Sequence, residues 1–126
     1  MPSSGGSRYG NGIEFYNSAV NVLVQNCWVY QVYDAGITNQ GGAGNPMENV
    51  TFKENLVEYC TWNIETWNNG VYKDQFFIDN ILRFAGYGWA NQRSVREYDS
   101  HINCWNNNFE TLENMQISGN ILQYLQ

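Results

Sequence analysis

The chain has 126 residues, of which 43% are hydrophobic and 16% aromatic, and a formal net charge of −6. This length suits a single domain. An acidic chain disfavours nucleic acid and anionic membranes as partners, because both attract basic surfaces. No apolar run approaches the roughly 18 residues that a membrane-spanning helix needs. We therefore expect one globular domain that binds neither nucleic acid nor a membrane.

Residues 1–8 are rich in serine and glycine and contain no apolar stretch, so we expect a flexible lead-in and not a signal peptide. The folded domain is expected to span residues 9–126, and the alternative expectation is that it is a fragment of a longer solenoid. The compartment is left open by the sequence. If the chain belongs to a longer secreted parent, an extracellular or cell-surface location follows.

Three short blocks recur about four times along the chain. The first blocks begin at Gly12, Gly36, Asn63 and His101, at intervals of 24, 27 and 38 residues. The second blocks begin at Asn21, Asn49, Asp74 and Asn114, and the third at Cys27, Asn55, Asn80 and Asn120. Each block alternates apolar and polar residues, which indicates strands and excludes helical repeats. The leucine ladder of leucine-rich repeats is missing. We predict an all-β parallel solenoid of about four coils.

Superposing the copies places like residues in columns that would point inward. The columns of the first blocks are Ile13, Ile37, Ile64, Ile102 and Phe15, Asn39, Thr66, Cys104. Those of the second are Val22, Val50, Gln75, Met115 and Val24, Phe52, Phe77, Ile117, and that of the third is Val29, Val57, Leu82, Leu122. Stacked at the strand spacing of about 4.8 Å, these columns fill a continuous core, in which only Asn39 is out of place. The column Cys27, Asn55, Asn80, Asn120 predicts a ladder of asparagine hydrogen bonds along the coils.

Blocks of the form N-V-x-V-x-x-N-x-V, followed by G-I-x, resemble the right-handed parallel β-helix repeats of the pectin-lyase-like superfamily. The resemblance covers about residues 9–126, and residues 86–93 are also similar to uncharacterised bacterial β-helix repeat proteins. It implies the fold and a carbohydrate-related activity, since the superfamily includes polysaccharide lyases, glycoside hydrolases, epimerases and phage tailspikes. No catalytic motif of pectate lyases or polygalacturonases matches, so the resemblance assigns no catalytic residue.

The third coil carries an insert at about residues 86–100. Inserts in repeat proteins lie in loops on one face, which is often the binding face. This insert holds Trp89, Arg93 and Asp99, and we expect them near the first strands.

Two further columns of the first strands are expected to point outward. One holds Glu14, Thr38, Glu65 and Asn103, and the other Tyr16, Gln40, Trp67 and Trp105. Aromatic rings stack on sugar rings and polar groups fix hydroxyls, so this face is typical of a polysaccharide groove. We predict that Glu14, Tyr16, Trp67, Trp89, Asn103 and Trp105 contact the sugar. The alternative is that the rings are covered and only structural.

Glu14 and Glu65 are expected two coils apart, or about 9.5 Å between backbones. This separation suits the carboxyl pair of an inverting glycosidase, at the upper end of its range of about 6.5–9.5 Å. Asp99 is an alternative partner for Glu65. His101, the only histidine, is a candidate proton acceptor, with Arg93 neutralising a uronate, unless the ring only pins the insert. We expect Asp34, before Gly36, to be a turn residue.

The three cysteines, Cys27, Cys60 and Cys104, show no metal-ligand spacing and no disulfide pattern. We expect no metal and no cofactor.

The leading functional hypothesis is binding or processing of a polysaccharide or oligosaccharide. If the protein is an enzyme, we expect a lyase or a glycoside hydrolase. The rival is a non-catalytic structural or assembly segment of a longer β-helix, and a third possibility is a phage or surface adhesin. Residues 109–126 show no cap, which predicts a homo-oligomer through the last coil.

Overall fold

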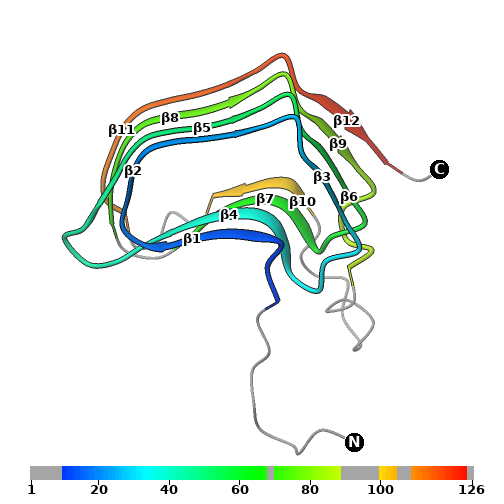
Figure 1. Ribbon diagram of the computed structural model, residues 1–126, viewed down its shortest axis with the longest axis horizontal. Coiled ribbons are helices and arrows are strands. Elements are labelled where there is room, and N and C mark those ends of the chain that lie inside the picture. Colours follow the sequence, from blue (N-terminus) through cyan, green and yellow to red (C-terminus); the bar gives the residue numbers. More distant parts are fainter. Residues whose placement is uncertain (1–9, 68–69, 89–99, 105–108, 125–126) are drawn as a thin grey trace, which may run out of the picture.

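A computed structural model describes residues 10–67, 70–88, 100–104 and 109–124. These residues form twelve strands in three four-stranded sheets, and every pair of neighbouring strands is parallel. Each coil passes once through each sheet, so the sheets form the sides of a stack of coils (Figure 1). The fold is therefore all-β and solenoid-like, as the sequence predicts. Within the described ranges, no helix is long and apolar enough to cross a membrane.

The three sheets take their strands in turn from successive coils. The first sheet contains β1 (Ile13–Asn17), β4 (Ala35–Gly41), β7 (Trp62–Trp67) and β10 (Ser100–Cys104). The second contains β2 (Ala19–Gln25), β5 (Pro46–Lys53), β8 (Gly70–Ile78) and β11 (Phe109–Ser118). The third contains β3 (Trp28–Tyr30), β6 (Leu56–Glu58), β9 (Ile81–Arg83) and β12 (Ile121–Gln123).

The register of the strands confirms the columns predicted from the repeats. Ile37 of β4 pairs with Ile13 on one side and with Ile64 on the other, and Ile64 pairs with Ile102. The inward columns of the second and third sheets pair in the same way. Because side chains alternate between the two faces of a strand, this register sends the same column into the core in each coil.

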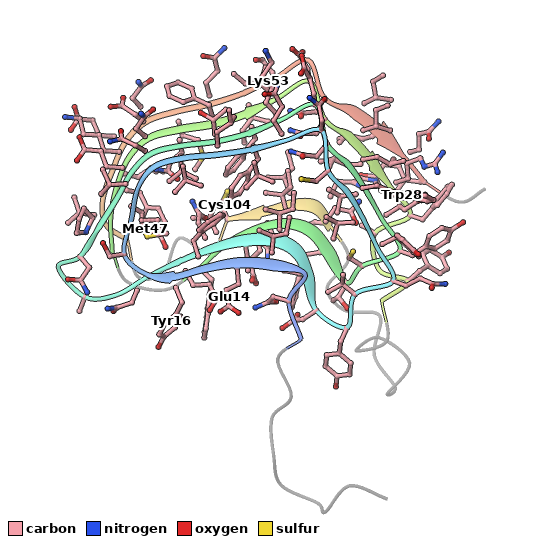
Figure 2. The ribbon with its side chains drawn as sticks, viewed as in Figure 1. Glu14, Tyr16, Trp28, Met47, Lys53 and Cys104 are labelled. Carbon is pink, nitrogen blue, oxygen red and sulfur yellow. The ribbon has the colours of Figure 1, made fainter. Side chains whose placement is uncertain are left out.

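The core is closely packed in the two middle coils. Ile37, Ile64, Phe52 and Phe77 are fully buried. The rings of Phe52 and Phe77 stack with centroids 5.3 Å apart and planes 10° apart. Such contacts between like side chains on successive coils make the core continuous along the stack. Cys104 points into the core (Figure 2). All three cysteines are free thiols.

The misplaced Asn39 has a partner on the opposite side of the core. Its Nδ2 donates to Oε1 of Gln75 at 2.6 Å, and Gln75 Nε2 donates to the carbonyl of Met47 at 2.6 Å. Both side chains are fully buried. Burying an amide is costly unless it is hydrogen-bonded, so the two polar residues compensate each other. The sequence placed each in an inward column without revealing this pair.

The predicted asparagine ladder is present at the turn between the second and third sheets. Asn55 Nδ2 donates to Oδ1 of Asn80 at 3.0 Å, and Asn80 Nδ2 donates to Oδ1 of Asn120 at 2.9 Å. The same oxygens accept backbone N–H groups, because Asn55 N and Asn80 N donate to them at 3.0 and 2.9 Å. Cys27 begins the ladder as a backbone donor to Asn55 Oδ1 at 3.0 Å. Each turn is thereby fixed to the next.

One polar residue inside each strand of the second sheet has a positive φ angle. The residue that opens each second block has a φ of 52° to 58° (Asn21, Asn49, Asp74 and Asn114). Asparagine and aspartate tolerate this left-handed region better than other non-glycine residues. The sequence therefore has an asparagine or aspartate at the position of this bend in every coil.

The last coil leaves inward columns open to solvent. Leu122 is 47% exposed and Ile117 is 48% exposed, whereas their partners in the preceding coil, Leu82 and Phe77, are fully buried. A residue of a terminal coil has a neighbour on only one side, so the same column is covered in the middle of the stack and uncovered at its end.

Ile64→Ala tests the inward assignment of the isoleucine column. Ile64 is fully buried between Ile37 and Ile102, so the substitution should lower the free energy of unfolding by about 2–5 kcal/mol. Chemical denaturation with constant m-value measures the change. An unchanged midpoint would contradict the register.

Candidate functional site

The outer face of the first sheet contains the predicted site, and the register confirms its two columns. Thr38 lies between Glu14 and Glu65, and Glu65 pairs with Asn103. Gln40 likewise lies between Tyr16 and Trp67. Glu14 and Tyr16 point away from the core on the first coil (Figure 2). Trp89, Arg93, Asp99 and Trp105 lie outside the described residues.

The expectation that both columns are exposed along their length is wrong. Thr38 is fully buried, Glu65 is 5% exposed and Gln40 is 6% exposed, while Tyr16 is 66% exposed. Trp67 and Asn103 are half-buried, and Glu14 is exposed. The exposed members of the two columns, Glu14 and Tyr16, both lie on β1, at one edge of the sheet. The accessible part of the predicted site is therefore the end formed by β1.

Thr38 lies between the two carboxylates of its column and is hydrogen-bonded to Glu65. Its hydroxyl donates to Oε2 of Glu65 at 3.2 Å, and both side chains are buried. The pairing places the backbones of Glu14 and Glu65 two strand spacings apart, or about 9.6 Å. This bond orients the carboxylate of Glu65, and the outward column presents Glu14 beside it at the accessible end.

Asp34 adds a third carboxyl group to this end of the sheet. Its backbone N–H donates to the carbonyl of Gly10 at 3.0 Å, and its own carbonyl accepts the N–H of Thr61 at 3.0 Å. The turn is thus held between two neighbouring coils. Burial raises the pKa of the Asp34 carboxyl from 3.8 to about 6, and the negative charge of Glu14 adds to the rise. Asp34 is therefore partly protonated near pH 6 next to a second carboxyl group, a combination typical of acid–base chemistry.

His101, the candidate proton acceptor, lies inside the fold. The ring is 2% exposed, and Nδ1 is 3.0 Å from Nδ2 of Asn63. An amide nitrogen only donates, so Nδ1 accepts this bond and the ring proton is on Nε2. The ring also packs edge-on against Tyr124, with centroids 4.4 Å apart. These contacts give His101 a packing role at the corner between the first and third sheets.

The position of His101 in the repeat explains its burial. The corresponding residue in the first two coils is Gly12 or Gly36, because the backbone there runs against the third sheet. A Cβ on Gly12 would come within 2.8 Å of Val29 Cγ1, and one on Gly36 would collide with Val57. The column therefore faces inward at this corner, and a larger side chain fits only in the later coils.

Sequence reasoning missed two features. Asp34 was taken for a turn residue only, because its pKa depends on burial that the local sequence does not encode. The second feature is the pair Trp28 and Tyr30, which are 64% and 51% exposed on β3 and lie outside the outward columns of the first strands. The alternation Trp28–Val29–Tyr30 around an inward valine could have revealed them.

Within the described ranges, no three His, Cys, Asp or Glu side chains gather closely enough to hold a metal ion. Comparison of the chain with protein-family models, with curated proteins and with solved structures found no match. The function is therefore argued from the geometry of this face alone.

The raised pKa of Asp34 predicts a pH dependence of stability. The folded state binds the Asp34 proton more tightly than the unfolded chain, so the free energy of unfolding should fall as the pH rises from about 4 to about 6. Asp34→Asn, which mimics the protonated form, should remove this component. Melting temperatures of both proteins across this range measure it, with the exposed Glu113→Gln as control. If melting temperature depends on pH in the same way for the original protein and for Asp34→Asn, the raised pKa of Asp34 is contradicted.

Proposed function

We propose that this chain is a right-handed parallel β-helix related to the pectin-lyase-like superfamily and that it binds a polysaccharide at the β1 end of the first sheet. The in-register columns and the asparagine ladder support the fold assignment. The observation that carries the binding proposal is the Tyr16 ring, 66% exposed beside the exposed carboxylate of Glu14. An exposed ring stacks on the apolar face of a sugar, and a neighbouring carboxylate accepts its hydroxyls.

The reaction that suits this end of the sheet is glycoside hydrolysis. Asp34, protonated up to about pH 6, would donate its proton to the leaving glycosidic oxygen. Glu14 would take a proton from the attacking water, whose oxygen forms the new bond to the anomeric carbon as the glycosidic bond breaks. Glu65, buried two coils away and held by Thr38, takes no part in this reaction. Lyase chemistry, with Arg93 neutralising a uronate, is the competing reaction.

Tyr16→Ala should weaken polysaccharide binding roughly tenfold, because it removes the stacking contact with the sugar. A tenfold change in the dissociation constant corresponds to about 1.4 kcal/mol. The change should leave the melting temperature unchanged, since the side chain is exposed. A glycan array selects the polysaccharide, and titration with amide spectra measures the affinity. Leu23→Ala, on a 60% exposed residue of the second sheet, is the matched control. If no neutral or acidic polysaccharide moves the amide signals around Tyr16, the proposal fails.

The rival function, an assembly segment, is favoured by the exposed columns of the last coil. We propose that a second copy of the chain covers Leu122 and Ile117, which are 47% and 48% exposed although their columns are core columns elsewhere. Unpaired strand edges and apolar surface together favour association.

Light scattering at micromolar concentration should show a dimer or larger species. Leu122→Glu should give the monomer, because a charge would be buried in the contact. Val20→Glu, on a 48% exposed residue of the first coil, should leave the assembly intact. A monomer in the unsubstituted protein, or equal effects of both substitutions, would contradict assembly through this coil.

A further inference from the structure

The outer face of the third sheet presents a pair of exposed aromatic rings. Trp28 and Tyr30 flank the inward Val29 on β3, and their ring centroids are 4.8 Å apart with planes tilted by 31°. They are 64% and 51% exposed, and Trp28 points away from the coil (Figure 2). The two rings form a continuous apolar surface on a rigid strand, on a different side of the stack from Glu14 and Tyr16.

A buried carboxylate fixes the orientation of these rings. The indole Nε1–H of Trp28 donates to Oε1 of Glu58 at 2.8 Å, and the Glu58 side chain is only 5% exposed. Arg83 Nε donates to the other oxygen of Glu58 at 2.9 Å and neutralises its charge. A buried carboxylate with two such partners is held in place, so Trp28 is oriented before any ligand arrives.

The arginine is itself held by aromatic contacts. Its guanidinium lies 5.4 Å from the centre of the Phe84 ring, and Phe84 packs on Tyr59 with centroids 4.9 Å apart. The Arg83 side chain remains 34% exposed, and a guanidinium has more N–H donors than the bonds to Glu58 use.

The register places an apolar stripe beside a polar one. The apolar stripe holds Trp28, Leu56, Ile81 and Ile121, and the polar stripe holds Tyr30, Glu58, Arg83 and Gln123. Ile81 and Ile121 are 39% and 55% exposed, so the apolar stripe stays accessible along the sheet. A sugar ring has the same two-sided character, with C–H groups on its face and hydroxyls at its rim.

The size of this face decides between a sugar and a protein as occupant. The strands are three residues long, so the face measures about 10 Å by about 14 Å, or on the order of 140 Å². A stable protein interface buries roughly 800 Å² on each partner, several times this area. The compensated charge of Glu58 and Arg83 favours an uncharged ligand over a uronate.

We propose that the outer face of the third sheet is a second carbohydrate site, which binds a short neutral oligosaccharide. Trp28 and Tyr30 stack on one sugar ring at the first coil, and Arg83 and Gln123, two and three coils further along the polar stripe, donate hydrogen bonds to hydroxyls of the following sugar units. The site is independent of the polysaccharide site proposed on the first sheet, and binding here requires no catalytic group.

Titration with cellotriose, maltotriose and xylotriose, with trigalacturonate as the charged comparison, tests the proposal. At least one neutral trisaccharide should shift the indole N–H signal of Trp28 saturably, and trigalacturonate should bind at least tenfold more weakly. Trp28→Ala and Tyr30→Ala should each weaken binding at least tenfold. Tyr30→Ala keeps the bond between Trp28 and Glu58, so this variant tests the binding site if Trp28→Ala fails to fold.

Two substitutions separate this site from the others. Tyr16→Ala should leave trisaccharide binding at the third sheet unchanged, so this proposal and the first-sheet proposal can fail separately. Leu23→Ala, an exposed apolar residue of the second sheet, should also have no effect. Absence of any Trp28 shift with all three neutral probes at millimolar concentration would overturn the proposal, as would undiminished binding by folded Tyr30→Ala.

Discussion

The turn before each third-sheet strand contains the side chain on which the stacking of the coils depends. Asn80 donates to Asn120 Oδ1 and to the carbonyl of Phe52, and its own Oδ1 accepts two bonds from Asn55. One amide thus connects three coils at a buried position. Because a slip of one residue would turn each inward column outward, a side chain that fixes the register also fixes the core.

The faces of the stack follow from this register. Once the isoleucine and phenylalanine columns point inward, the alternate residues must form the outer faces of the three sheets. Exposure differs along one outward column. Tyr16 on the edge strand β1 is 66% exposed, whereas Gln40, its neighbour in the same column, is 6% exposed. The two proposed carbohydrate surfaces both use exposed rings of the first coil, Tyr16 on the first sheet and Trp28 and Tyr30 on the third.

The sequence predicts the fold well because the repeat contains several independent signals for the same register. The isoleucine column, the asparagine ladder and the polar bends with positive φ all agree. The sequence predicts the site less well, because exposure and pKa depend on contacts between coils. Glu65 was expected outside and is 5% exposed, and the burial of His101 involves Asn63 of the preceding coil. The pair of Asn39 and Gln75 spans two sheets and leaves no local pattern.

The most direct test of this account is substitution of the central asparagine. Asn80→Ala should lower the free energy of unfolding by about 1–3 kcal/mol for each buried group that loses its partner, and should speed hydrogen exchange at the Asn55 amide. Asn45→Ala is the matched control, because it removes an exposed amide pair with Asn17 and should change stability by less than about 0.5 kcal/mol. Unchanged stability and unchanged exchange at Asn55 in Asn80→Ala would contradict the account.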